Sequence, residues 1–136
     1  MEYKFDNGVG YLIIVAAGKV KNKFYQVLSS YDITPEQWII LTRLRESDGK
    51  TQKQLAQETF KDEPNIARIL RKMEAKGYIE RGADDKDKRI TLVFITQRGI
   101  QLFEQLIPLV SEHQKRTVKN LSADEISTLK TLLGKI

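Results

Sequence analysis

The stretch that decides the fold is DEPNIARILRKMEAKGYIERGADDKDKRITLVFIT, residues 62–96. Its first half carries apolar residues at the spacing of an α-helix, and its last residues alternate like those of a β-strand. Six consecutive charged residues, 84–89, lie just before that strand. The tip that they form is either a solvated hairpin turn or a finger that touches a negatively charged partner.

The helix in this stretch has a defined beginning and end. Asp62 is in the N-cap position, Pro64 falls in the first turn, and Gly77 is a C-terminal stop. The two strands around the charged tip are predicted at 78–81 and 89–96. The stripe of the helix that faces the core is Ile66, Ile69, Leu70 and Met73.

Two shorter helices precede this one. Residues 34–47 and 51–60 each begin with the Thr-x-x-Gln pattern of a capping box. A short helix joined by a tight turn to a longer one is a helix-turn-helix arrangement. The order of elements therefore predicts this motif, with its second helix at 62–77 and a β-hairpin wing beside it.

Three outer helices are predicted at 9–31, at 97–117 after a cap at Thr96, and at 122–136, where Ile126, Leu129, Leu132 and Leu133 are expected to be buried. The first two of them carry apolar residues on two sides. Pro108 interrupts the hydrogen-bond ladder of the second of these helices and is expected to kink it. Because a helix that is apolar on two sides needs two partners, a second copy of the chain is a candidate partner.

Composition excludes several classes of function. The 136 residues contain no cysteine, which excludes a disulfide scaffold, a thiol nucleophile and a cysteine-ligated zinc site, and the single histidine, His113, excludes a histidine metal cluster. The net charge of +5 favours a polyanionic partner without requiring one. The apolar run 10–18 is too short to span a bilayer, and positive charges follow it rather than precede it as in a signal peptide. We therefore expect a cytoplasmic protein with no membrane partner.

The helix at 62–77 carries the candidate DNA-reading side chains. Asn65, Arg68 and Lys72 lie at i, i+3 and i+7, opposite the apolar stripe. An Asn side chain can form two hydrogen bonds with the edge of adenine, and an Arg side chain can form two with the edge of guanine. The further candidate contacts are Pro64 and Arg71 on the same helix, Lys86, Lys88 and Arg89 on the wing, and Thr51, Lys53 and Lys61 at phosphates.

Two acidic residues of the wing have a different predicted role. Asp84 and Asp87 are expected to brace the wing by hydrogen bonds or ion pairs, because carboxylates repel the phosphates of DNA. The alternative for all of these charged residues is that they form ordinary solvated faces.

The segment LRKMEAKGYIERGADDKDKRITLVFIT, residues 70–96, resembles the MarR-type winged-helix transcription regulators. Asp84, Asp87 and Arg89 match the D-x-x-D-x-R tip of that family's wing, and the resemblance extends from about Val9 to the end of the chain. It implies a mainly α-helical fold of six helices with a small antiparallel β-hairpin wing. In this single chain, 1–136, the winged helix-turn-helix is expected at 34–96 and the dimerisation part at 8–31 and 97–136.

The resemblance also implies how such a protein works. It implies an intertwined homodimer, formed by the first helix and the last two, that binds a pseudo-palindromic operator in double-stranded DNA, with Arg89 in the minor groove. Members of the family commonly release DNA when a small aromatic or anionic effector binds between the dimerisation and DNA-binding parts.

The sequence departs from the family pattern at the start of the reading helix. Phe60 occupies the turn position that usually holds glycine, and Pro64 and Asn65 replace the usual Ser-Thr pair, so the operator sequence cannot be copied from relatives. Asp62 and Glu63 would weaken general affinity for phosphates. The oxidation-sensing branch uses an amino-terminal cysteine, which this chain lacks.

The leading interpretation is a sequence-specific DNA-binding regulator, most simply a repressor, with no catalytic residue, cofactor or metal. The alternative is a winged-helix protein-interaction module that does not bind DNA, which the modest net charge and the acidic pair Asp62 and Glu63 keep open. An enzyme is disfavoured because the sequence contains no evident nucleophile–base pair and no Gly-rich phosphate loop.

Overall fold

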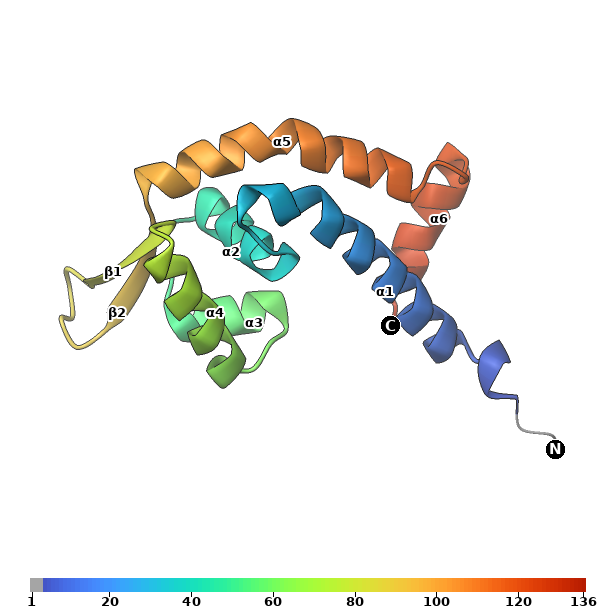
Figure 1. Ribbon diagram of the computed structural model, residues 1–136. Coiled ribbons are helices and arrows are strands. Elements are labelled where there is room, and N and C mark those ends of the chain that lie inside the picture. Colours follow the sequence, from blue (N-terminus) through green and yellow to red (C-terminus); the bar gives the residue numbers. More distant parts are fainter. Residues whose placement is uncertain (1–3) are drawn as a thin grey trace. The chain divides into compact units, whose positions relative to one another are not determined.

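The computed structural model describes residues 4–136, and Figure 1 shows the arrangement of the elements within each part of the chain. Six α-helices and one two-stranded antiparallel sheet make up this described part, as expected. In chain order the elements are η1 (Phe5–Asn7), α1 (Val9–Leu28), η2 (Ser29–Tyr31), α2 (Pro35–Glu46), α3 (Gln52–Thr59), α4 (Glu63–Ala75), β1 (Ile79–Ala83), β2 (Thr91–Ile95), α5 (Gln97–Thr117) and α6 (Ala123–Leu133).

The predicted helix starts are confirmed by their caps. Thr34, Thr51 and Ser122 each accept a hydrogen bond from a backbone N–H three residues later and complete a capping box. Asp62 caps α4 through a 2.8 Å bond from the Asn65 N–H. Thr96 Oγ1 accepts from the Gly99 N–H at 3.1 Å in the first turn of α5. These caps satisfy backbone donors that a helix leaves unpaired at its amino-terminal end.

Several predicted boundaries were wrong. The first helix ends at Leu28 rather than at residue 31, because Ser29–Tyr31 tightens into a 3₁₀ turn and Asp32 adopts a left-handed conformation with φ of 54°. The second strand begins at Thr91 rather than at residue 89, since the Ile90 N–H donates to the Asp87 carbonyl oxygen in a turn. The bounds of α5, Gln97–Thr117, are as predicted, with Pro108 inside the helix.

The wing is an antiparallel hairpin in which Ile79 pairs with Ile95 and Ala83 with Thr91. The other edge of β2 is also engaged, because Lys50 and Val93 exchange two backbone hydrogen bonds of 3.2 and 2.7 Å. The β2 strand is therefore held on both sides at its middle residue, which makes the hairpin stiffer than a two-stranded ribbon alone.

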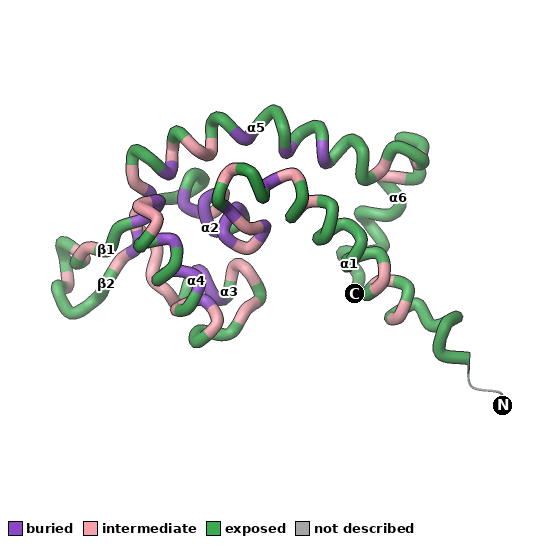
Figure 2. Tube along the Cα trace, in the orientation of Figure 1, coloured by how far each residue is buried: buried purple, intermediate pink, exposed green. Residues whose placement is uncertain are grey.

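The chain divides into two compact units, Leu28–Ile107 and the remainder, which contains residues up to Val27 together with Pro108–Ile136. Figure 2 shows buried segments gathered in α2, α3, α4 and the base of the hairpin. The fully buried side chains of the Leu28–Ile107 unit are Leu28, Ile40, Leu41, Leu44, Leu55, Ile66, Leu70, Met73, Ile79, Val93 and Leu106. A continuous core of this kind fixes the positions of α3, α4 and the wing within the unit.

This unit is longer at both ends than the predicted winged part, 34–96. Tyr78 Oη donates to the Asp32 carbonyl oxygen at 3.0 Å, which ties the turn before α2 to the end of α4. At the other end, Phe103 on α5 stacks on Trp38 on α2, with 4.9 Å between ring centroids. These long-range contacts extend the compact unit at both ends.

The other unit has little core of its own. Among its described residues only Val110 and His113 are buried, and His113 stacks on Phe24 with 4.7 Å between ring centroids. Burial, and then the nearby charge of Lys23, lower the pKa of His113. The expected burial of the α6 stripe was wrong for this single chain, because Ile126 is only half-buried and Leu129, Leu132 and Leu133 are exposed.

Candidate nucleic-acid interface

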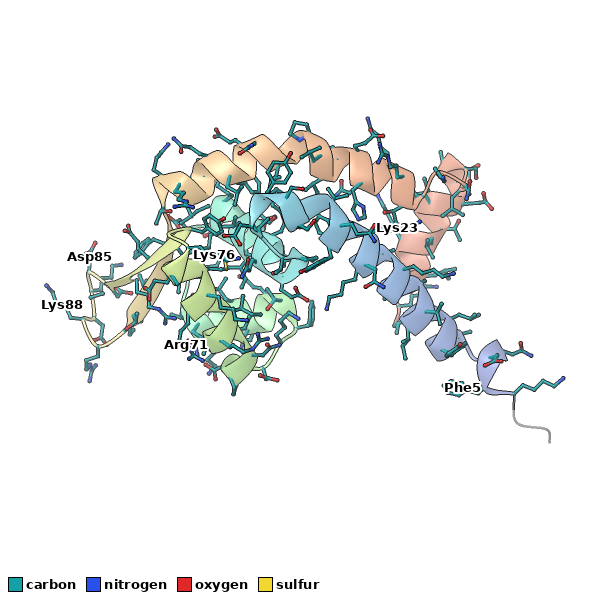
Figure 3. All side chains as sticks on the ribbon, in the orientation of Figure 1. Phe5, Lys23, Arg71, Lys76, Asp85 and Lys88 are labelled. Atoms are coloured by element: carbon teal, nitrogen blue, oxygen red, sulfur yellow. The ribbon has the colours of Figure 1, made fainter. Side chains whose placement is uncertain are left out.

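Helix α4 has one face in the core and one in solvent. Ile66, Ile69, Leu70 and Met73 are buried, whereas Arg68, Arg71 and Lys72 are exposed and Asn65 is half-exposed. Figure 3 labels Arg71 among the side chains of this helix. The exposed face therefore carries three cations and one amide on a backbone that the opposite face holds in place.

Asn65 and Arg68 contact each other in this structure. Arg68 Nη2 donates to Asn65 Oδ1 at 2.7 Å across one turn of the helix. The two groups that can pair with adenine and guanine edges are thus brought together on the predicted face. Pro64, in the first turn of α4, is also exposed.

The three candidate phosphate contacts lie at the two ends of α3. Thr51 is the N-cap of α3, and its Oγ1 accepts from the Gln54 N–H at 3.1 Å, while the hydroxyl group also carries the O–H donor that a phosphate contact would use. Lys53 is exposed in the first turn. Lys61, in the turn after α3, is half-exposed, and its N–H donates to the Ala56 carbonyl oxygen at 3.0 Å.

The wing tip is ordered by its own carboxylates. Asp84 Oδ1 accepts from the Lys86 N–H at 2.8 Å. Asp87 accepts three hydrogen bonds of 3.0 Å from Arg89, one from the backbone N–H and two from the guanidinium. These bonds lower the pKa of the Asp87 carboxyl and raise that of Arg89.

The wing tip is electrically balanced. Residues 84–89 contain three acidic and three basic side chains, which gives the tip a formal charge of zero. Lys86, Lys88 and Arg89 are exposed, and the Arg89 side chain keeps 90% of its surface accessible although it is paired with Asp87. Figure 3 shows Asp85 and Lys88 at the tip, away from the helices. The tip therefore offers an oriented guanidinium rather than a net positive charge.

The loop before α3 was not among the predicted features. Lys50 Nζ forms a 2.7 Å ion pair with Glu58 of α3, and Asp48 Oδ1 accepts from the Ile95 N–H at 2.9 Å. Gly49 adopts a φ of 72°, and an added Cβ there would lie 3.0 Å from the Phe94 ring. The Asp-Gly pair predicts a turn, but it does not predict that this turn forms hydrogen bonds with β2.

The carboxyl end of α4 is fixed by a second polar cluster. Lys76 Nζ lies 3.0 Å from the Asp32 carbonyl oxygen, 3.2 Å from its carboxylate and 3.1 Å from Gln37 Oε1. Burial, and then the Asp32 carboxylate, raise the pKa of the neighbouring Tyr78. Figure 3 labels Lys76 at this end of the helix. Helix α4 is thus anchored at both ends, by Asp62 and by Lys76.

No group of three or more His, Cys, Asp or Glu residues within 4–136 is arranged to hold a metal ion. Over the same residues, no helix is both long enough and apolar enough to cross a membrane.

Comparisons with known proteins agree on one family. The MarR family model matches residues 31–90. The multiple antibiotic resistance protein MarR of Escherichia coli is 35% identical over 130 residues, which are 94% of this chain and 90% of that protein. The chain belongs to the MarR family.

Solved structures share the MarR fold. A mutant of Escherichia coli MarR complexed with operator DNA matches with a TM-score of 0.89 at 34% identity, over 93% of this chain and 91% of that one. A structure of Bordetella bronchiseptica BpsR, whose DNA binding is regulated by 6-hydroxynicotinic acid, has a TM-score of 0.93 at 24% identity. The match covers 99% of this chain and 96% of that one. The second match shows the fold alone.

Family and fold together show that the chain is a DNA-binding transcriptional regulator with a winged helix-turn-helix. The MarR family consists of transcription regulators and not of enzymes. The turn before α4, where the family pattern has glycine, holds Phe60 in the left-handed region with φ of 57°. Phe60 therefore adopts a backbone conformation that glycine favours.

Proposed function

We propose that two copies of this protein bind a pseudo-palindromic DNA operator and repress transcription from an adjacent promoter. Each copy places the amino-terminal part of α4 in the major groove and the wing against the flanking backbone. The observation that carries this proposal is the exposed polar face of α4, which lies opposite four buried residues of the same helix.

Each group of side chains has a role in this arrangement. Asn65 and Arg68 read base edges, Pro64, Arg71 and Lys72 lie along the groove, and Thr51, Lys53 and Lys61 meet phosphates. Lys86 and Lys88 reach backbone beside the minor groove that Arg89 enters. Asp84 and Asp87 hold the tip in shape, which their hydrogen bonds support.

A homodimer is supported by the exposed apolar surface of α1 and α6. Large apolar side chains of these helices and of the segments just before α1 and just after α6 are between 38% and 81% exposed, among them Phe5, Val9, Leu12, Ile14, Val20, Leu129, Leu132, Leu133 and Ile136. Monomeric soluble proteins rarely leave so many large apolar residues in water. A second copy that covers them also gives the two-fold symmetry that a pseudo-palindromic site requires.

We also propose that a small aromatic or anionic effector releases the protein from DNA in the cytoplasm. The support is the fold shared with BpsR. Such an effector must bind the DNA-free state more tightly than the DNA-bound one. A screen of aromatic acids for compounds that both raise the melting temperature and lower DNA affinity checks this, and a screen in which no compound does both counts against it.

DNA binding is tested with the duplex upstream of the protein's own coding sequence, and a shuffled duplex of equal composition is the control. At physiological salt we expect tighter binding to the upstream duplex. Equal affinity for both duplexes contradicts a sequence-specific regulator.

A protein-interaction module is the alternative, and the zero formal charge of the wing tip favours it. Salt distinguishes the two, because each phosphate contact releases counterions and makes the logarithm of the affinity fall with the logarithm of the salt concentration. DNA binding through several cations predicts a steep fall, and a flat salt dependence supports the alternative.

A further inference from the structure

Phe60, in the turn between α3 and α4, has two features that cost folding free energy. Its φ of 57° is in the left-handed region, where a residue with a Cβ is strained. Its side chain is 95% exposed, so the ring gains nothing from the core. Glycine would avoid both costs. The left-handed conformation itself closes the end of α3, since the Lys61 N–H then donates to the Ala56 carbonyl oxygen at 3.0 Å. Folding therefore accounts for the conformation but not for a phenylalanine in it, and an intermolecular contact of the ring accounts for that choice of residue.

The position of Phe60 connects it to the reading end of α4. Phe60 is the C-cap residue of α3, and its N–H donates to the carbonyl oxygens of Ala56 and Gln57. Asp62, the N-cap of α4, follows two residues later. Two peptide units span at most about 7.6 Å, so the Phe60 Cα lies no farther than this from the Cα of Asp62, at the end of α4 that is proposed to enter the major groove.

The exposed face of α4 is rich in hydrogen-bonding groups and poor in apolar ones. The large apolar residues of the helix, Ile66, Ile69, Leu70 and Met73, are all buried on the opposite face. Adenine and guanine are read by hydrogen bonds, whereas thymine also presents a C5-methyl group that apolar side chains such as Phe contact. Beside Pro64, Phe60 supplies an exposed apolar surface at this end of the helix.

We propose that the Phe60 ring makes an apolar contact with the C5-methyl group of a thymine at the edge of the site that α4 reads. This inference rests on the proposed function. It adds a specificity determinant to the reading surface and predicts a thymine at one fixed position of each half-site.

Two variants remove the ring with different effects on the fold. Phe60→Ala keeps a Cβ in the left-handed region, whereas Phe60→Gly also relieves the strain and is expected to have a melting temperature at or above that of the natural chain. A loss of DNA affinity in Phe60→Gly therefore cannot be attributed to unfolding. Lys61→Ala is the matched control, because loss of a neighbouring phosphate contact weakens all sequences alike.

The probe is the tightest duplex selected from a random DNA pool, in which each thymine is replaced in turn by uracil. Uracil keeps the base pair and removes only the methyl group. For the natural chain and for Lys61→Ala, we expect one replacement in each half-site to lower the affinity about fourfold, the effect of one buried methyl-sized group. Phe60→Gly and Phe60→Ala should bind the thymine and uracil duplexes equally well.

The outcomes separate this inference from the proposed function. If Phe60→Gly still discriminates thymine from uracil, or if no replacement affects the natural chain, the inference is wrong while DNA binding stands. It is also wrong if Phe60→Gly lowers the affinity for random duplexes as much as for the selected one, or if it dissociates the dimer in sedimentation. If no duplex is selected from the pool, the proposed function fails, and the inference fails with it.

Discussion

Asn65 and Arg68 contact each other within α4, through the 2.7 Å bond from the guanidinium to the amide oxygen. The bond uses one of the guanidinium N–H donors and one lone pair of the amide oxygen, so both side chains keep hydrogen-bonding groups for a base. Their spacing in the sequence predicted a shared face. It did not predict their contact, because side-chain rotamers are not fixed by spacing.

Replacing Arg68 with alanine should change which base is preferred at one position of the half-site. A lost bidentate contact to guanine costs about 1–3 kcal/mol at that position and leaves the others unaffected. Binding to a set of single-base operator variants measures this. Lys88→Ala is the control and should weaken all sequences equally, whereas an unchanged base preference in Arg68→Ala would mean that the reading face is assigned wrongly.

The wing tip permits a comparison between two aspartates of equal charge. Asp87 holds the Arg89 side chain and backbone by three hydrogen bonds, whereas Asp85 is exposed at the same tip. Each Asp→Asn change removes one negative charge near DNA, which by itself strengthens binding. We expect Asp85→Asn to bind as tightly as the natural chain or more tightly, and Asp87→Asn to bind more weakly because Arg89 loses its orientation.

Operator affinity of the two variants at one salt concentration is the measurement. Equal effects of Asp87→Asn and Asp85→Asn would show that the ordered tip contributes nothing to binding.

At the scale of elements, local signals in the sequence predicted the helix starts and the hairpin. The caps at Thr34, Thr51 and Asp62 depend on residues within one turn, which is why they could be read directly. The pairing of Lys50 with Val93 and the cluster around Lys76 join residues more than 35 positions apart. Such contacts depend on the folded core and carry no local pattern.

The start of α5 gives the element-scale prediction. A Cβ added at Gly99 would collide with the Tyr78 carbonyl oxygen and lie 2.8 Å from Ile95 Cγ1, so Gly99→Ala must push the helix away from the hairpin. We expect its free energy of unfolding to fall by about 1–3 kcal/mol. Chemical denaturation measures this, with Gly134→Ala as the control, because a Cβ there makes only ordinary contacts at 3.5 Å. Equal stability of the two variants would contradict the close approach.

At the scale of the whole molecule, the two compact units differ in how much of their apolar surface they bury. The unit Leu28–Ile107 has its own core, and the helices of the other unit keep large apolar side chains in water. Two-sided apolar helices were predicted from the sequence, but the α6 stripe was wrongly expected to be buried within one chain. Periodicity shows that a face needs a partner and does not show whether that partner is in the same chain.

Two copies related by two-fold symmetry require a DNA site that consists of two inverted half-sites. Selection of bound duplexes from a random pool therefore tests the central claim, that paired α4 helices read base edges, most directly. We expect enrichment of an inverted repeat whose half-sites lie about 10 base pairs apart, centre to centre, or a multiple of that spacing. Enrichment of a lone half-site, or no enrichment at physiological salt, would contradict it.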